Sequence, residues 1–458
     1  MENLSYAKGN IPAGYEIKYN TVDYFLDRYD EEEGLVTLSS YWKRFSDNRK
    51  AQEISHIILI EDEKLDNVTN NVIFYKDLIK ECSVKPKLPR VQNDEDLIIL
   101  TTSGSVGKPK LVQKSQRGYI NFYTNIAKSG SIVYQGVGFS DRPLSYTGGI
   151  GYIFSFMNGM KYITTEHSCS NENTVTTKHL ADIISTENCT SAVFFGYLLY
   201  DMVNDIESFK RLAKSVKVII TSGQEIVMPI IHRLWETFPA IPIIDVYAAT
   251  ETGMIFSRMR TKVNPNPIPS LAVGAELSIR DKNGDVTDRN QIGQIWVRTV
   301  SQMKYYLTDP MQTSLTITTS GWLKTADLAL ITNDGDIVFQ GRINDVLKIA
   351  TLNQYPQPIE NKMNTQRCIE ISIIIGLPDD RLGTIPCLIV ELKKEWRDKR
   401  AEARREIENF WNEHFKNDKE SGEVFTLSRL LFINKWPLTS SQKILRRELI
   451  NLCQIGKI

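Results

Sequence analysis

Residues 216–250 read VKVIITSGQEIVMPIIHRLWETFPAIPIIDVYAAT, and this stretch decides the fold class. The runs at 216–223 and 241–250 are short, apolar and rich in Val and Ile, which is typical of buried strands. Between them, the apolar residues of 228–239 recur at helical spacing and predict an amphipathic helix. A strand, a helix and a second strand in this order form the repeating unit of a parallel sheet. We therefore predict an α/β fold that binds its ligands at the carboxyl ends of the strands.

The same alternation of strands and helices extends back to about residue 91, which predicts a doubly wound α/β domain. In this part, SAVFFGYLL at 191–199 is a predicted strand, and MVNDIESFKRLAKS at 202–215 is the predicted helix that follows it. The first 90 residues mix two helix-like segments with a short strand at 54–62. We expect these residues to form a shortened N-terminal part of the large domain.

The character of the chain changes after residue 270. Residues 271–340 contain short strands around Asn-Gly and Asp-Gly turns, which predict a β-rich subdomain. A small mixed pattern of strands and charged helices then fills the rest of the chain. We place a boundary near residue 343, with a large domain at 1–343 and a small α+β domain at 344–458.

The composition excludes several classes of protein. Lys plus Arg and Asp plus Glu number 55 each, so no global charge favours nucleic acid or a membrane surface as a partner. No run reaches the roughly 18 apolar residues of a membrane span, and the N-terminus has no apolar signal segment. The six cysteines and five histidines are scattered without metal-ligand spacing. We expect a reduced, cytoplasmic protein without a Cys or His metal site.

Residues 97–114 read LIILTTSGSVGKPKLVQK and predict a phosphate-binding loop. A strand that ends in a loop of Thr, Ser and Gly offers backbone N–H groups and hydroxyls, and Lys108 and Lys110 add positive charge. The loop differs from the P-loop of GTPases, which needs Ser or Thr where Pro109 stands. On its own, such a stretch can also be a plain connection.

Four segments occur in order along the chain, at 101–110 (TTSGSVGKPK), 245–251 (DVYAATE), 324–348 (KTADLALITNDGDIVFQGRINDVLK) and 436–449 (WPLTSSQKILRREL). Together they resemble the adenylate-forming, or AMP-binding, superfamily, which includes acyl- and aryl-CoA synthetases, nonribosomal-peptide adenylation domains and luciferases. The resemblance implies ATP and Mg²⁺ as cofactors. It also implies a reaction in which a carboxylate attacks the α-phosphate of ATP, giving an acyl-adenylate and pyrophosphate, before a thiol displaces AMP.

The resemblance assigns the loop residues that hold the β- and γ-phosphates, namely Thr102, Ser103, Gly104, Ser105, Gly107 and Lys108. Val106 stands where the family usually has Thr, so one hydroxyl is missing.

Five further residues match the nucleotide site of the family. Tyr247 matches the aromatic residue that packs against adenine, Thr250 the hydroxyl near the α-phosphate, and Glu251 the carboxylate that holds Mg²⁺. Asp327 matches the acid that binds both ribose hydroxyls, and Arg342 matches an arginine that also reaches the ribose.

The small domain carries two more matches. Lys443 matches the lysine that bridges the acyl carboxylate and the α-phosphate, although Gln442 replaces the usual Gly before it. Asn344 stands at the hinge about which the family's C-terminal domain swings between its two half-reactions. Thr351 replaces a Gly that lets the pantetheine thiol approach closely.

The acid substrate is expected to be aryl or acyl rather than an amino acid, because no carboxylate lies between Arg142 and Glu166 to pair with an amino group. The segments before 245–251 look most like benzoate-type ligases. Candidate residues of the acid pocket are Tyr146, Gly148, Gly149, Gly223 and Val246, beside Tyr247.

Three functions remain open at this point. The first is an adenylating ligase that passes its acyl group to an acyl-carrier protein, a peptidyl-carrier protein or CoA. The second is a CoA ligase of primary metabolism of the o-succinylbenzoate type. The third is a degenerate member that binds nucleotide without turnover, since Val106, Ala326, Gln442 and Thr351 all depart from the family pattern.

Overall fold

The computed structural model describes residues 6–8, 57–59, 72–74, 92–102, 110–128, 136–140, 160–164, 176–223, 226, 228–350, 352–416, 425–438 and 444–458. Within these ranges, none of the helices has both the length and the apolar character that crossing a membrane requires.

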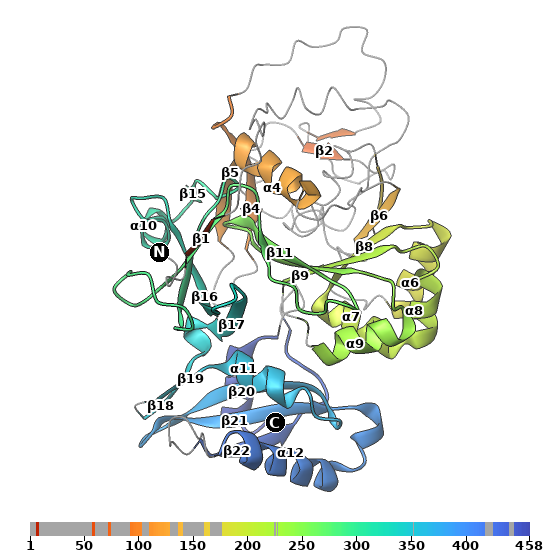
Figure 1. The fold of residues 1–458 in the computed structure, drawn as a ribbon, viewed down its shortest axis with the longest axis vertical. Helices are drawn as coiled ribbons and strands as arrows, with labels where there is room; N and C mark the ends of the chain where they lie inside the picture. Colours follow the sequence, from red (N-terminus) through yellow and green to blue (C-terminus); the bar gives the residue numbers. More distant parts are fainter. Residues whose placement is uncertain are drawn as a thin grey trace.

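A seven-stranded sheet forms the centre of the part of the chain that precedes residue 343, as the α/β prediction requires (Figure 1). Its strands, in spatial order, are β12 (Ser270–Leu271), β11 (Gly253–Arg260), β10 (Ile243–Ala249), β9 (Val218–Ser222), β8 (Ser191–Phe195), β6 (Val137–Ser140) and β7 (Lys161–Ile163). The strands from β7 to β10 are parallel, whereas β11 and β12 run antiparallel to their neighbours. The carboxyl ends of the parallel strands therefore lie along one edge of the sheet.

The helices between these strands bury one apolar face each. They are α6 (Thr177–Thr186), α7 (Gly196–Asn204), α8 (Ile206–Leu212) and α9 (Met228–Thr237). In α9, Ile231, Leu234 and Trp235 are buried in one cluster with Ile219 and Ile243 of the sheet. Each such side chain contributes about 1.5–3 kcal/mol by leaving water. The predicted strand–helix–strand unit at 216–250 is thus confirmed.

The predicted strand at 191–199 is too long, because β8 ends at Phe195 and α7 begins at Gly196. In the following residues, Leu198, Leu199, Met202 and Val203 are buried at helical spacing, and this packing overrides the apolar strand-like run. The predicted helix at 202–215 is also divided. Asp205 ends α7 and caps α8, where its side chain accepts a hydrogen bond from the Ser208 N–H at 3.2 Å.

Two antiparallel sheets pack beside the central one. The larger contains, in order, β1 (Tyr6–Lys8), β13 (Glu276–Arg280), β14 (Gly293–Arg298), β16 (Leu323–Ile331) and β17 (Ile337–Arg342), which is the predicted β-rich part. The smaller contains β15 (Tyr305–Tyr306), β5 (Leu111–Ser115) and β4 (Asp96–Thr101), and helix α4 (Gln116–Lys128) follows β5. A short helix, α10 (Pro310–Thr316), follows β15, and β2 (Ile57–Leu59) pairs in parallel with β3 (Val72–Phe74).

The C-terminal residues form a further sheet with its own apolar core (Figure 1). Its elements are β18 (Leu347–Ile349), β19 (Leu352–Gln354), α11 (Pro356–Met363), β20 (Ile369–Asp379), β21 (Gly383–Leu392), α12 (Arg400–His414), β22 (Arg429–Phe432) and α13 (Arg446–Gln454). The predicted division near residue 343 lies between β17 and β18. That the two parts are independent domains stays a prediction.

Helix α7 of the large domain touches β20 of the C-terminal sheet. The Tyr200 hydroxyl donates to the Glu370 carbonyl at 2.8 Å, and the Asn204 amide donates to the Glu370 carboxylate at 2.7 Å. Ile371 packs at the edge of the apolar cluster that α7 shares with the central sheet.

Arg446 joins three parts of the C-terminal sheet. Its guanidinium donates to both carboxylate oxygens of Glu360 at 2.7 Å and to the Ile374 carbonyl at 2.9 Å. It also lies 3.3 Å from the Asp345 carboxylate. The Glu360 side chain is only 4% exposed, so its charge depends on this partner.

We expect Arg446→Met to lower the local free energy of unfolding by about 3–5 kcal/mol, because it leaves the buried Glu360 carboxylate unpaired. Native-state hydrogen exchange of the β20 and β21 amides measures this change. Arg447→Met, on the exposed neighbour in α13, is the control and should change it by no more than about 0.5 kcal/mol. Equal effects of the two substitutions would contradict the role of the Arg446–Glu360 pair.

Candidate functional site

The predicted phosphate loop connects two antiparallel strands, β4 and β5. At its base, the Thr102 N–H donates to the Lys110 carbonyl at 3.0 Å, and the Lys110 N–H donates to Thr102 Oγ1 at 3.2 Å. Thr102 therefore closes the loop. The other predicted loop residues lie outside the described part of the chain, namely Ser103, Gly104, Ser105, Gly107 and Lys108. The same holds for Tyr146, Gly148, Gly149 and Lys443.

The carboxyl end of β10 carries four of the predicted site residues. Val246 and Tyr247 belong to the strand, and Thr250 and Glu251 lie in the turn that leads into β11. Gly223 follows the neighbouring strand β9 with a φ of 91°, a conformation that favours glycine. The Ser222 hydroxyl donates to the Val246 carbonyl at 2.9 Å and ties the ends of β9 and β10 together.

The structure brings Tyr247, Asp327 and Arg342 into one cluster. The Tyr247 hydroxyl donates to one carboxylate oxygen of Asp327 at 2.6 Å. Arg342 lies directly across the β16–β17 ladder from Asp327, and its Nε is 3.4 Å from the other carboxylate oxygen. Residues that are 80 positions apart in sequence thus meet because β10 ends beside β16.

The Tyr247 ring also packs against two phenylalanines. Its centroid lies 5.0 Å from that of Phe256 and 4.8 Å from that of Phe339. Burial and the adjacent Asp327 carboxylate raise the pKa of the Tyr247 phenol well above its usual value. The phenol therefore stays protonated and acts as a hydrogen-bond donor to Asp327.

Glu251 is held by Tyr306, a residue that the sequence analysis did not single out. The Tyr306 hydroxyl donates to a Glu251 carboxylate oxygen at 2.9 Å. Burial and the Glu251 charge raise the pKa of this phenol above its usual value, so it remains a donor. The Lys110 ammonium lies 4.7 Å from the centre of the Tyr306 ring, and it links this pair to the base of the phosphate loop.

The donor set around Glu251 fits Mg²⁺ that arrives with ATP. Among the described residues, no group of three His, Cys, Asp or Glu side chains is arranged to hold a metal ion. Mg²⁺ commonly binds to one or two carboxylates together with substrate phosphates, so a single carboxylate beside a phosphate loop suits it.

Lys114 of β5 is buried beside the same turn, with 3% of its surface exposed. Its ammonium donates to the carbonyls of Glu251 at 3.2 Å and Ser301 at 2.5 Å. Burial lowers the pKa of Lys114 to about 7, and the Glu251 charge opposes that shift.

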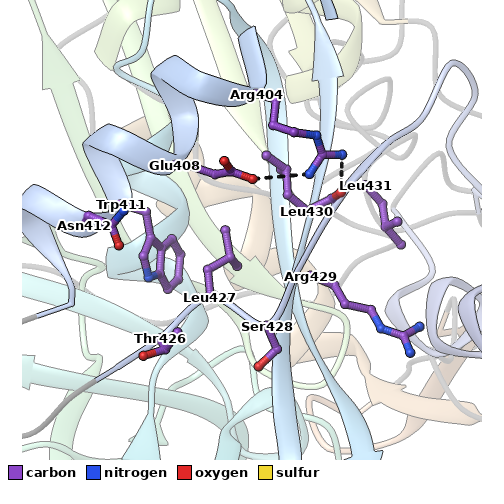
Figure 2. A pocket seen from close by; sticks show the side chains of 10 residues that line it. All are labelled: Arg404, Glu408, Trp411, Asn412, Thr426, Leu427, Ser428, Arg429, Leu430 and Leu431. Carbon is purple, nitrogen blue, oxygen red and sulfur yellow. Dashed lines mark hydrogen bonds and ion pairs between the residues drawn. The ribbon is translucent and has the colours of Figure 1, made fainter. Parts of the chain in front are cut away.

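Two other features lie away from this cluster. Asn344, the predicted hinge residue, is exposed in the 3₁₀ turn Ile343–Asp345 between β17 and β18. A cavity of about 430 Å³ lies between α12 and β22, where Arg404 pairs with Glu408 and donates to the Leu430 carbonyl (Figure 2). None of the predicted site residues lines this cavity.

Residues 36–307 match the family model of the AMP-binding enzymes, which is more than half of the chain. The chain belongs to this family. The matched range includes Tyr247, Glu251 and Tyr306 and ends before Asp327. The resemblance to adenylate-forming enzymes is thereby confirmed, as is the expectation of an enzyme of the acyl-adenylate-forming ligase class.

Several relatives of this AMP-binding enzyme are acid–CoA ligases. It is 24% identical over 412 residues to 4-coumarate-CoA ligase 1 of Narcissus pseudonarcissus, covering 86% of this chain and 71% of the relative. It is 22% identical over 383 residues to 2-succinylbenzoate–CoA ligase of Bacillus subtilis, covering 81% and 72%.

Solved structures of adenylate-forming enzymes share the fold. Amide bond synthetase McbA from Marinactinospora thermotolerans has a TM-score of 0.74 at 18% identity, over 91% of this chain and 79% of that one. The o-succinylbenzoate CoA synthetase of Bacillus subtilis, in complex with its acyl-adenylate, has a TM-score of 0.67 at 20% identity, over 86% and 78%.

We expect Asp327→Asn to weaken AMP binding by about 10- to 100-fold, because hydrogen bonds to a charged group contribute about 1.5–3 kcal/mol. Isothermal titration calorimetry with AMP measures this effect. The control is Asp334→Asn, in the exposed turn of the same β16–β17 hairpin, which should bind AMP as the unaltered protein does. Equal affinity for all three proteins would show that Asp327 does not bind the nucleotide.

Proposed function

We propose that this AMP-binding enzyme activates a carboxylic acid with Mg²⁺ and ATP, releasing pyrophosphate and retaining an acyl-adenylate. The observation that carries the proposal is the pairing of Tyr247 with Asp327 beside the turn that presents Glu251. The Tyr247 ring suits the adenine, and the Asp327 carboxylate suits the ribose. The Glu251 carboxylate, after β10, suits the cation-bound phosphates. The phosphate loop between β4 and β5 supplies the remaining donors.

Asp327 keeps its capacity to bind a ribose. Each of its oxygens has one described partner, Tyr247 or Arg342, and a carboxylate oxygen has two lone pairs. The ribose hydroxyls would take the remaining positions, while Arg342 and Tyr247 hold the carboxylate in place. In this proposal, Mg²⁺ bound at Glu251 supplies Lewis-acid stabilisation of the phosphates.

The reaction needs charge stabilisation more than acid–base catalysis. A carboxylate oxygen of the acid forms a bond to the α-phosphorus, the bond from that phosphorus to the bridging oxygen breaks, and pyrophosphate leaves with the electron pair. No proton moves in this step. We therefore assign to Lys443 the task of neutralising the acid carboxylate and the α-phosphate as they approach, with Thr250 beside the α-phosphate. Residues 344–458 would turn about Asn344 after this step.

The acid is proposed to be aryl or acyl. The curated relatives named above act on 4-coumarate and 2-succinylbenzoate, and the stretch between Arg142 and Glu166 has no carboxylate for an amino group. An o-succinylbenzoate-type CoA ligase is therefore the second candidate.

ATP–pyrophosphate exchange with a panel of aryl, alkyl and amino acids tests the proposal. We expect exchange with an aryl or alkyl acid and none with amino acids. Lys443→Ala should reduce this exchange to background while ATP binding stays intact, because the lysine acts on the reacting groups rather than on nucleotide affinity. ATP binding without exchange in the unaltered enzyme would instead identify a non-catalytic nucleotide-binding protein.

The acceptor is proposed to be a thiol. Thr351 disfavours thioester formation with free CoA, so a carrier-protein thiol or another acceptor is proposed in place of CoA. A β-branched side chain would narrow the path that a Gly leaves open to pantetheine. One similar structure, with a TM-score of 0.65, holds an adenylation domain together with its peptidyl-carrier protein, although the relatives named above are CoA ligases.

Thioester formation with CoA and with carrier proteins, followed by mass spectrometry, distinguishes these acceptors. We expect slow transfer to CoA, and Thr351→Gly should accelerate it without changing the exchange reaction. Rapid CoA thioester formation by the unaltered enzyme would overturn the carrier-protein assignment and favour the CoA ligase.

A further inference from the structure

Lys114 is a buried lysine on β5, a strand whose last four residues, 112–115, are all buried. Val112 and Lys114 are two residues apart on β5, so their side chains lie on the same face of the strand. Val112 is fully buried in a cluster with Met303 and Tyr306, and Lys114 is 3% exposed. Burying an amine or ammonium group without partners is costly, so its contacts must offset that cost.

These contacts are two backbone carbonyls from separate segments. The ammonium donates to the Glu251 carbonyl in the turn after β10 and to the Ser301 carbonyl in the segment before β15. Lys114 itself belongs to β5, so its side chain joins this strand to two segments that are 137 and 187 residues away in sequence. Removing this side chain would leave the two carbonyls without that donor.

The same two segments also contact each other directly. The Met303 N–H donates to the Glu251 carbonyl at 2.6 Å, and the Thr299 hydroxyl donates to the Thr252 carbonyl at 2.5 Å. Gly253 ends the turn with a φ of 69°, and a Cβ there would come within 2.5 Å of the Ser301 side chain. Three residues after Met303, Tyr306 holds the Glu251 carboxylate. The backbone and the side chain of Glu251 are therefore both held by residues 303–306.

We propose that Lys114 is a positioning residue that sets the location of the Glu251 carboxylate by joining the Glu251 turn to the Ser301 segment. Through that location, it governs the affinity of the site for the divalent cation that accompanies ATP. This inference rests on the proposed function, in which Glu251 holds the cation.

A second lysine offers a matched comparison. Lys304 also ties the 301–306 segment to the rest of the molecule, but it does so through the Asp96 carboxylate at 2.6 Å and the Asp94 carbonyl at 2.9 Å. Its contacts are on β4 and the residues before it, away from Glu251. Loss of either lysine loosens the segment, whereas only loss of Lys114 should displace Glu251.

The test compares Lys114→Met with Lys304→Met in the full chain. Mn²⁺ binding in the presence of a non-hydrolysable ATP analogue is measured by electron paramagnetic resonance. We expect Lys114→Met to weaken Mn²⁺ binding by about 10-fold, as supporting residues of metal sites typically do. The kcat of pyrophosphate exchange should fall by up to about 100-fold through misplacement of the phosphates, while KM for the acid stays within about twofold. Lys304→Met should leave all three values within about twofold.

A double-mutant cycle tests whether the effect passes through Glu251. In a Glu251→Gln background, Lys114→Met should change Mn²⁺ affinity by less than about twofold. Additive losses would overturn the proposal, as would unchanged or tighter Mn²⁺ binding by Lys114→Met alone.

The remaining outcomes concern the folding of the variants and the proposed function itself. If Lys114→Met does not fold, Lys114→Gln, which keeps N–H donors on a shorter side chain, takes its place in the same measurements. If neither variant folds, Lys114 serves folding and the positioning role is overturned. Absence of exchange in the unaltered enzyme would count against the proposed function. Exchange in the unaltered enzyme, together with a Mn²⁺ affinity that Lys114→Met leaves unchanged, would count against the role of Lys114 alone.

Discussion

The reversal of the chain between β10 and β11 is the constraint on which the described site depends. β10 is the last parallel strand of the central sheet, and β11 returns antiparallel beside it, so the turn at 250–252 lies at the edge where ligands bind. Gly253 permits this turn because its backbone is left-handed and the Ser301 side chain leaves no room for a Cβ. The turn places Glu251 against Tyr306, and the end of β10 places Tyr247 against Asp327. The end of β10 and this turn therefore together connect the parallel sheet, the β4–β5 hairpin and the β-rich sheet.

Much of this arrangement could be predicted from the sequence because its signals are local. The strand–helix–strand pattern at 216–250 and the Asp-Gly hairpin before Arg342 each involve neighbouring residues, and the structure confirms both. The strand predicted at 191–199 is present but too long, because the apolar residues after Phe195 pack as a helix, and a short apolar run does not distinguish these states. The motif predicts Asp327 and Arg342 as ribose ligands, and the register of the β16–β17 ladder places the two residues opposite each other. Their role toward ribose remains a prediction.

Tyr306 and Lys114 could not be found in this way, because their importance comes from contacts made far along the chain. Tyr306 lies in a short strand with no motif of its own, and it meets Glu251 only because β15 pairs with β5. Lys114 follows the predicted phosphate loop, and nothing in the sequence distinguishes it from the other lysines nearby, Lys108 and Lys110. The sequence of β5 carries one weak signal, since Lys114 stands two residues after Val112 and so places a charge on the same face of the strand as that valine. Recognising that signal requires knowing that β5 is covered on this face.

The two halves of the proposed site differ in how firmly the chain holds them. Tyr247 is hydrogen-bonded to Asp327, and Glu251 to Tyr306, within packed sheets. Lys443 belongs to the C-terminal part, whose contact with α7 includes two hydrogen bonds and the packing of Ile371. At that contact, partial desolvation and the carboxylates of Glu391 and Glu370 raise the pKa of Asp201 above its usual value. Acidic side chains that oppose one another's ionisation weaken the contact in which they meet, and polar interfaces between parts of a chain commonly permit relative motion. The proposed reaction in two half-steps would use this difference, because the nucleotide would stay in place while the group that acts on it is exchanged.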